Sequence, residues 1–156
     1  MRRGIVFPFL IATIVLILDQ LTKYVISTYL KTYESIRVLP FFQIVHVRNK
    51  GAAFGMFQNL GNTVFIGISL VAIIIVVVMI IKSKDDRIAF SLILGGALGN
   101  LADRLIRGYV VDFLDFYAGQ YHWPAFNIAD SALTVGIVLL FIGAFYKEFY
   151  KLKSRK

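Results

Sequence analysis

The sequence predicts an all-α polytopic membrane protein with four transmembrane helices. The chain of 156 residues is 58% hydrophobic, whereas soluble domains usually contain about 45–50% apolar residues. Its apolar residues are concentrated in four long runs. One of them, Thr63–Ile81, is nineteen residues long and contains no charge, and about twenty apolar residues span a bilayer. The basic residues lie mainly between and after these runs, as membrane topology requires.

Composition also limits the chemistry and the partners. The chain contains no cysteine and only two histidines, His46 and His122. Disulfides and thiolate metal sites are therefore excluded, and little remains for a zinc site. We expect no metal and no cofactor. The formal net charge is +8, but topology explains this charge, so we expect no nucleic-acid partner.

The first run, residues 5–28, follows a charged start, as a cleaved signal peptide would. We favour a retained helix, because no small-residue cleavage site follows Leu18 and the helical pattern continues beyond it. Asp19 and Lys23 lie at i and i+4 on one face of that helix. This pair is equally consistent with a structural ion pair and with a functional site.

Residues 31–62 are predicted to lie outside the membrane. Residues 35–48 are rich in β-branched and aromatic types with partial alternation, which favours short strands. In the segment Asn49–Phe57, small residues are interleaved with Phe54 and Phe57. This pattern predicts a short amphipathic helix or lid on the membrane surface. An ordinary Gly-rich loop is the simpler local interpretation.

The second and third spans, residues 63–81 and 88–106, are joined by a short polar connection. In the third span, Gly95 and Gly99 form a small-xxx-small pattern that allows close helix approach, so we expect these glycines to serve packing. Helical spacing also places four polar residues on one face of this span. They are Asn100, Asp103, Arg104 and Arg107.

Asp130 is the only charged residue of the fourth span, residues 126–146. A charge at that depth is expensive, so an acidic residue there is a candidate functional residue. Asn127, Ser131 and Thr134 recur with Asp130 at helical spacing and form a polar stripe. Such a stripe requires polar partners from other segments.

An even number of spans places both termini on one side of the membrane. That side holds ten of the seventeen basic residues, so it is predicted to be cytoplasmic. The ten are Arg2, Arg3, Lys82, Lys84, Arg87, Lys147, Lys151, Lys153, Arg155 and Lys156. Residues 108–124, predicted as a short strand or interfacial turn, then lie outside together with the start of the fourth span.

Two acids gather near this outer face, Asp112 and Asp130, eighteen residues apart. When two carboxylates share a low-dielectric site, the pKa of one rises, so one acts as a base on water and the other polarises a carbonyl. This chemistry is aspartyl peptide hydrolysis. The simpler interpretation is that Asp112 and Asp115, at i and i+3 on a loop, are solvated surface charges.

A proton-coupled transporter or an assembly subunit would also use buried acids. In such a protein the acids would form a proton relay, and its ionisable side chains should continue to the cytoplasmic end of the bundle. The inner halves of the second and fourth spans, residues 71–81 and 135–145, contain no ionisable group. A one-sided site therefore favours an enzyme.

Five blocks, in this order, resemble the lipoprotein signal peptidases of bacteria, also called signal peptidase II. They are DQLTK at 19–23, NKGAAFG at 49–55, GGALGNLADR at 95–104, VVDF at 110–113 and FNIADS at 126–131. The resemblance covers nearly the whole chain. It implies a single integral-membrane peptidase domain over residues 1–156, with four helices, a small extracytoplasmic β-cradle and a short surface helix.

The same resemblance implies an aspartyl endopeptidase of the bacterial cytoplasmic membrane with its active site at the extracytoplasmic face. Its substrates would be diacylglyceryl-modified prolipoproteins, cut just before the lipidated cysteine. Other expected partners are membrane lipids and globomycin-type cyclic peptide inhibitors. By match to the VVDF and FNIADS blocks, Asp112 and Asp130 are the catalytic pair. The positions that bind substrate or support the site are Asp19, Lys23, Asn49, Gly51, Phe54, Asn100, Arg104 and Asn127.

Overall fold

Four long helices dominate the computed structural model of the chain, which describes residues 3–51 and 61–153. Each helix is long and apolar enough to cross a membrane by length and composition. This result confirms the predicted four-helix membrane fold. The helices are α1 (Arg3–Tyr29), α2 (Gly61–Lys82), α3 (Arg87–Ile106) and α4 (Ile128–Lys153).

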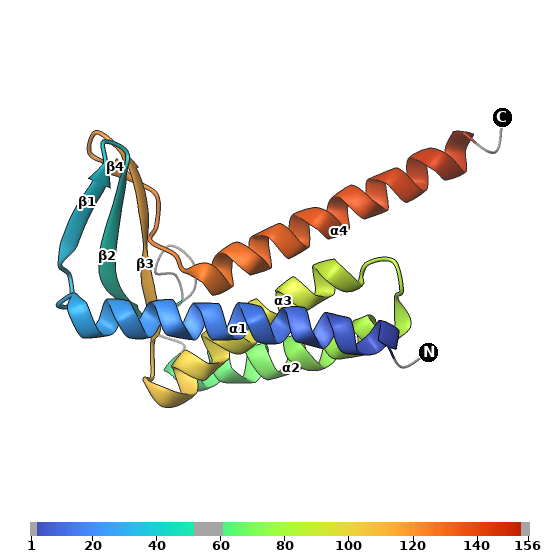
Figure 1. Cartoon of the computed structure of the whole chain (residues 1–156), viewed down its shortest axis with the longest axis horizontal. Helices are drawn as coiled ribbons and strands as arrows, with labels where there is room; N and C mark the ends of the chain where they lie inside the picture. Colours follow the sequence, from blue (N-terminus) through green and yellow to red (C-terminus); the bar gives the residue numbers. More distant parts are fainter. Residues whose placement is uncertain (1–2, 52–60, 154–156) are drawn as a thin grey trace.

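A four-stranded antiparallel sheet stands at one end of the helices (Figure 1). Its strands follow the order β1-β2-β3-β4. The hairpin of β1 and β2 forms from the segment whose β-branched and aromatic residues predicted strands. Residues 108–124 form a longer strand than the sequence indicated, because β3 pairs along β2. The strands are β1 (Ser35–Leu39), β2 (Phe42–Asn49), β3 (Val110–Ala118) and β4 (Tyr121–His122).

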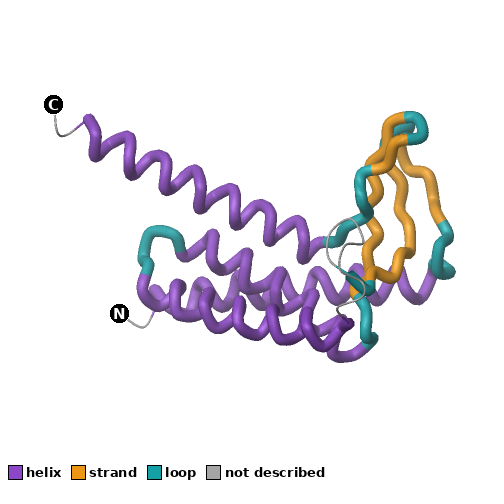
Figure 2. Tube along the Cα trace, turned by 180° about the vertical axis from the view of Figure 1, so that it is seen from behind, coloured by secondary structure: helices purple, strands orange, loops and turns teal. Residues whose placement is uncertain are grey.

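Both described ends of the chain lie far from the sheet, at the opposite end of the helices (Figure 1). The connection between α2 and α3 lies at that end as well (Figure 2). Helix α4 diverges from the other helices toward its C-terminal end (Figure 1). There, Lys147 Nζ forms an ion pair with Asp86 of the α2–α3 connection at 2.9 Å.

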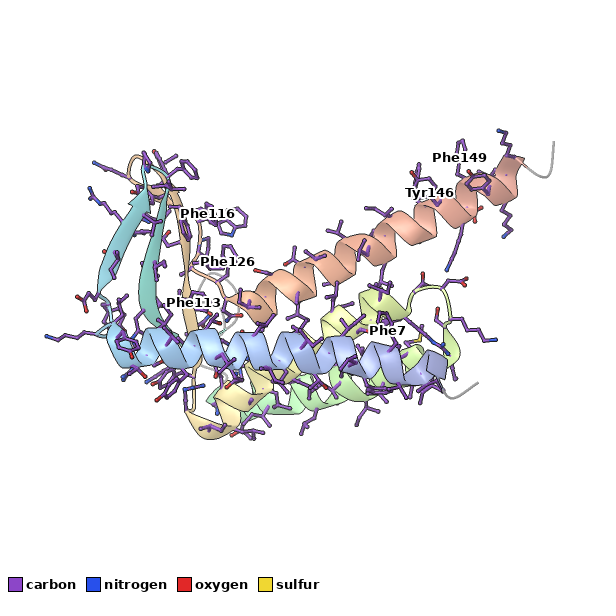
Figure 3. The ribbon with its side chains drawn as sticks, viewed as in Figure 1. Phe7, Phe113, Phe116, Phe126, Tyr146 and Phe149 are labelled. Atoms are coloured by element: carbon purple, nitrogen blue, oxygen red, sulfur yellow. The ribbon has the colours of Figure 1, made fainter. Side chains whose placement is uncertain are left out.

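Phe126 joins the central strand β3 to the start of α4. Its carbonyl oxygen accepts the N–H groups of Phe113 at 3.0 Å and Leu114 at 2.8 Å, and its own N–H donates back to Leu114. Its ring stacks on that of Phe116, with centroids 6.0 Å apart. Phe116 and Phe126 thus stack on each other where the sheet leads into α4, far from Tyr146 and Phe149 (Figure 3).

Glycines allow α3 to approach its neighbours closely. A Cβ atom at Gly95 would lie 2.7 Å from the backbone oxygen of Ala12 in α1. A Cβ atom at Gly136 of α4 would lie 2.7 Å from the backbone oxygen of Ala89 in α3. Side chains at these positions would push the helices apart. The packing role expected for Gly95 is therefore confirmed.

Candidate functional site

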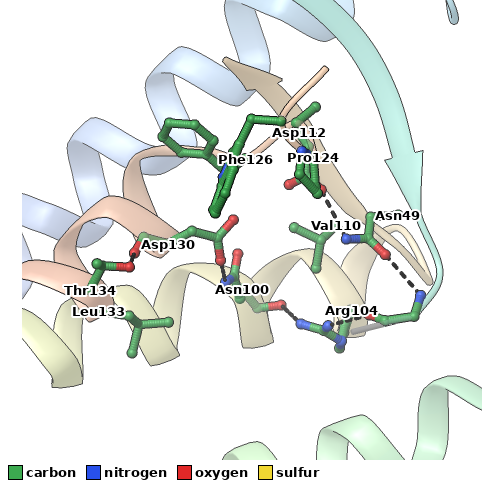
Figure 4. Close-up of a pocket in the computed structure, with 13 residues that line it drawn as sticks. Asn49, Asn100, Arg104, Val110, Asp112, Pro124, Phe126, Asp130, Leu133 and Thr134 are labelled. Atoms are coloured by element: carbon green, nitrogen blue, oxygen red, sulfur yellow. Dashed lines mark hydrogen bonds between the residues drawn. The ribbon is translucent and has the colours of Figure 1, made fainter. Parts of the chain in front are cut away.

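A pocket of about 460 Å³ lies between α3, the start of α4 and the sheet (Figure 4). It brings together Asp112 from β3 and Asp130 from α4, referred to below as the aspartate pair. Among the residues predicted for the site, six line this pocket. They are Asn49, Gly51, Asn100, Arg104, Asp112 and Asp130.

Asp130 is held by a reciprocal cap at the start of α4. The side-chain oxygen Oδ1 of Asn127 accepts the backbone N–H of Asp130 at 2.9 Å. In return, Asp130 Oδ2 accepts the backbone N–H of Asn127 at 3.2 Å. This is a capping box, and it places a carboxylate where the helix dipole stabilises negative charge. Asn127 therefore lies just before the helix as its cap, whereas the predicted polar stripe placed it within the span.

Asparagines supply a hydrogen bond to every oxygen of the aspartate pair. Asp112 accepts from Asn127 Nδ2 at 2.7 Å and from Asn49 Nδ2 at 2.9 Å. The other Asp130 oxygen, Oδ1, accepts from Asn100 Nδ2 at 2.8 Å. Asn127 thus contacts both acids, through its side chain on one and its backbone on the other. The two carboxylates are fixed relative to each other by one residue.

Asp112 is 2% exposed and pairs with Val47 of β2 in the sheet. Burial, together with the nearby charge of Asp130, raises the pKa of Asp112 from 3.8 to about 7. Its asparagine donors oppose this rise without cancelling it. An acid that still holds its proton near neutral pH can donate it during a reaction.

The interpretation of residues 112 and 115 as solvated surface charges is wrong. Both acids are buried, because β3 lies inside the sheet and packs against the helices. Asp115, 6% exposed, accepts hydrogen bonds from Gln43 at 2.6 Å and from His122 at 2.8 Å. It does not line the pocket that holds the aspartate pair. Strand alternation places Asp112 and Asp115 on opposite faces of the sheet.

Lys23 and Asp19 do not line the pocket but lie fully buried next to it. Lys23 Nζ lies 2.8 Å from Asp19 Oδ2 and 3.0 Å from Asp103 Oδ2, and donates to Asn100 Oδ1 at 3.1 Å. Buried charges require such partners. The Asp19–Lys23 pair is therefore an ion pair, and it extends into a larger group. We call Asp19, Lys23, Asn100 and Asp103 the Lys23 cluster.

The Lys23 cluster reaches the residue before each member of the aspartate pair. Asp103 Oδ2 accepts the backbone N–H of Val111 at 3.0 Å. Asp19 Oδ1 accepts the backbone N–H of Ala129 at 2.9 Å. Gly99 permits this approach, because a Cβ atom there would lie 2.5 Å from Asp19 Oδ2. The cluster thus fixes the backbone on both sides of the pocket.

Arg104 and Asp103 do not neutralise each other, because helix geometry points them to different partners. Asp103 pairs with Lys23 and with Arg107. Arg104 Nη2 donates to the backbone oxygen of Gly51 at 3.2 Å, and its guanidinium lies 5.2 Å from the ring centre of Phe65. It therefore connects α3 to the segment that follows β2.

The sequence did not predict the apolar walls of the pocket. It also did not predict the hydrogen bonds from the Lys23 cluster to the backbone beside the pocket. The walls consist of Val110, the segment Trp123–Phe126, and Leu133. The only signal was the position of this segment directly before the capping residue Asn127. Thr134 of the predicted polar stripe also lines the pocket. The predicted lid is not described beyond Gly51, so Phe54 and Phe57 lie outside the described residues.

The described side chains offer no evident metal site. Over residues 3–51 and 61–153, no group of three or more His, Cys, Asp or Glu side chains is arranged to hold a metal ion. The chemistry available in the pocket is that of a carboxylate pair, amide donors and one guanidinium. Acid–base catalysis on a bound carbonyl suits this set of groups.

Comparisons with known proteins agree on one family. The family model described as signal peptidase (SPase) II matches residues 11–146. A lipoprotein signal peptidase of Thermodesulfovibrio yellowstonii is 48% identical and covers 81% of this chain and 86% of its own length. A lipoprotein signal peptidase of Alteromonas mediterranea is 46% identical, and the match covers 86% of this chain and 78% of the relative's length.

Two solved structures share the fold. Both are described as bacterial membrane enzymes. The first has a TM-score of 0.84 and 41% identity, and covers 91% of this chain and 89% of its own. The second has a TM-score of 0.80 and 42% identity, with coverage of 88% and 92%. The comparisons give no support to the transporter alternative, and they establish a multi-pass bacterial membrane enzyme. The chain belongs to the lipoprotein signal peptidase (signal peptidase II) family, the membrane proteases that remove signal peptides from prolipoproteins.

Proposed function

We propose that the aspartate pair is the catalytic centre of this peptidase. The observation that carries the proposal is the contact of Asn127 with both acids, which come from different elements and line one pocket. In the proposed mechanism the pair shares one proton, and the raised pKa of Asp112 keeps that proton bound up to about neutral pH. A pair in this state contains a base and an acid at the same time.

The reaction then needs only water and the pair. The ionised carboxylate takes a proton from water as the water oxygen bonds to the scissile carbonyl carbon. The protonated carboxyl donates a hydrogen bond to the carbonyl oxygen, which becomes negatively charged in the tetrahedral intermediate. The carbon–nitrogen bond then breaks, and the departing amine receives a proton from the pair. One proton remains on the pair, so the next cycle starts from the same state.

The proposed substrate is a diacylglyceryl-modified prolipoprotein, cut just before the modified cysteine. The pocket supports this choice, because polar catalytic groups face apolar walls at the sheet end of the helices. Acyl chains can remain in lipid while the scissile bond meets the acids. A globomycin-type cyclic peptide should occupy the same pocket, and membrane lipids should surround it.

The remaining predicted residues receive supporting roles in this proposal. Asn49, Asn100 and Asn127 orient the acids, and Arg104 with Gly51 offers polar groups to an extended peptide backbone. Asp19 and Lys23 act through the Lys23 cluster. Phe54 is proposed to close over the substrate, as a lid that excludes bulk water. We propose that residues 1–156 act as one membrane peptidase domain.

Replacement of either acid by asparagine tests the proposal. Asn is nearly isosteric with Asp but cannot act as a base or hold the shared proton. Asp112→Asn and Asp130→Asn should each lower the cleavage rate by about 10²–10⁴-fold. The double variant should lose little more than either single variant, because the two residues act as a unit. The measurement is cleavage of a lipidated prolipoprotein, followed by gel shift.

The matched control is Asp115→Asn, which changes a buried acid of the same strand outside the pocket. It should change the rate much less. All three single variants should still bind a globomycin-like peptide, which reports on folding. Rapid cleavage by a folded Asp112→Asn variant would exclude the aspartyl mechanism at this site.

The pH dependence of cleavage follows from the raised pKa of Asp112. At sufficiently low pH both acids hold protons and no base remains. Above about pH 7 Asp112 loses its proton, so the pair keeps a base but no acid. The profile of kcat/KM against pH should therefore be bell-shaped, with activity falling as pH rises through about 7. A rate that is constant between about pH 5 and about pH 9 would contradict this assignment.

The orientation in the membrane is a further part of the proposal. The termini and the α2–α3 connection are placed in the cytoplasm, and the sheet with the pocket outside. The chain has no cysteine, so single cysteines report without background. In intact cells, Thr32→Cys should react with a membrane-impermeant thiol reagent and Lys84→Cys should resist it. The opposite labelling pattern would reverse the orientation and place the pocket on the cytoplasmic side.

A further inference from the structure

A second pocket, of about 400 Å³, lies beside the end of β2. Its lining residues are Thr32, Tyr33, Arg48, Lys50 and Tyr109. None of them lines the pocket of the aspartate pair. We call this second site the basic pocket, because its only charged side chains are one guanidinium and one ammonium group. The proposed peptidase mechanism makes no use of it.

The two cations of the basic pocket are not neutralised by acidic side chains. All nine Asp and Glu residues of the chain lie within residues 3–51 and 61–153. In this described part, neither Arg48 nor Lys50 forms an ion pair with an acidic side chain. Arg48 and Lys50 therefore present uncompensated positive charge. Such a pocket favours an anionic ligand.

The aromatic ring of Tyr109 orients the side chain of Arg48, one of these two cations. The guanidinium carbon of Arg48 lies 5.0 Å from the centre of the Tyr109 ring. This cation–π contact restrains the guanidinium plane, and a ring face takes up none of its five N–H donors. A planar guanidinium beside an ammonium group is suited to the oxygens of a phosphate.

The position of the basic pocket at the ends of α1 and α3 indicates where an anionic ligand would come from. Tyr33 follows the end of α1 at Tyr29, and Tyr109 follows the end of α3 at Ile106. Tyr29 and Tyr33 are each 79% exposed. Exposed tyrosines where helices leave the bilayer are typical of the interfacial belt at lipid headgroup level. At this height, the abundant phosphate groups are those of phospholipid headgroups.

The backbone at Tyr33 holds this side chain in an uncommon position. Its φ angle is 67°, a left-handed conformation that usually favours glycine. Its N–H donates to the backbone oxygen of His46 at 2.8 Å, which fixes the turn against β2. The ring is thereby presented next to Arg48 and Lys50 at the rim of the pocket.

We propose that the basic pocket binds the phosphate headgroup of an anionic glycerophospholipid from the leaflet on the sheet side. Arg48 and Lys50 contact the phosphate oxygens, and the hydroxyl groups of Thr32 and the two tyrosines contact the glycerol and phosphate. Basic pockets near the membrane surface attract anionic headgroups in this way. The site is independent of catalysis and does not require the aspartate pair.

The experiment measures lipid retention by the full-length protein. The protein is purified from nanodiscs containing equal amounts of phosphatidylglycerol and phosphatidylcholine, and bound lipid is counted by native mass spectrometry. Wild type should retain phosphatidylglycerol in preference to phosphatidylcholine. Arg48→Gln and Lys50→Gln should each weaken retention about fivefold, and the double variant about 25-fold, because each surface cation contributes about that factor.

The matched control for the single variants is Arg37→Gln. It removes one cation from an exposed position of the sheet outside the basic pocket and should retain lipid as wild type does. Asp112→Asn should also retain lipid normally, which separates this proposal from the catalytic one. If a double variant fails to fold, the two single variants give the comparison.

Three outcomes would overturn the proposal. Equal retention by wild type and the Arg48→Gln/Lys50→Gln variant would show that the pocket binds no headgroup. A loss in the Arg37→Gln control equal to that in the single variants of the basic pocket would reduce the effect to general surface charge. Displacement of the lipid by soluble glycerol phosphate at the same concentration, or by a short acidic peptide, would assign the pocket to a ligand other than membrane lipid.

Discussion

The buried ammonium group of Lys23 is the interaction on which the site depends. It lies between two carboxylates and the side-chain oxygen of Asn100, with no exposure to solvent. Removing one partner from such a group costs about 3–5 kcal/mol, because an uncompensated charge remains buried. The requirement for mutual neutralisation therefore holds α1 and α3 together at a fixed position along their length.

From this centre, three connections lead to the aspartate pair. Asp103 holds the backbone before Asp112, Asp19 holds the backbone before Asp130, and Asn100 bonds directly to the Asp130 carboxylate. Gly99 allows the helices to come close enough for these contacts. Electrostatics in the helices thus position Asp112 of the strand β3 and Asp130 in the first turn of α4.

The environment of the aspartate pair fits the hydrolytic role proposed for it at a membrane. Amide groups of asparagine stabilise carboxylates without adding charge, so the pair retains a raised pKa at Asp112 while every oxygen has a donor. Apolar walls lie beside the polar groups of the pocket, which is next to the sheet. A proton relay would need polar groups through the full thickness of the membrane, and the inner halves of the second and fourth spans lack them.

Much of this arrangement could be predicted from the sequence, and the exceptions have physical reasons. Hydropathy identified the four helices, and the i, i+4 spacing identified Asp19 with Lys23, because these signals are local. The burial of Asp115 and the partners of Asp103 depend on pairing between distant segments, which local patterns do not encode. Asn127 was placed in the helix because a capping residue has the same i, i+3 spacing to Asp130 as a residue on the helix face.

The most direct test of the central claim is the titration of the Asp112 carboxyl in the intact protein. With aspartate labelled by carbon-13 at the side-chain carboxyl, NMR follows each acid with pH, and Asp112→Asn assigns the signal. The account predicts a pKa of about 7 for Asp112. It also predicts that this pKa falls in the Asp130→Asn variant, because the charge of Asp130 contributes to raising it. A pKa near 4 for Asp112, or one that Asp130→Asn leaves unchanged, would show that the two acids do not act as a pair.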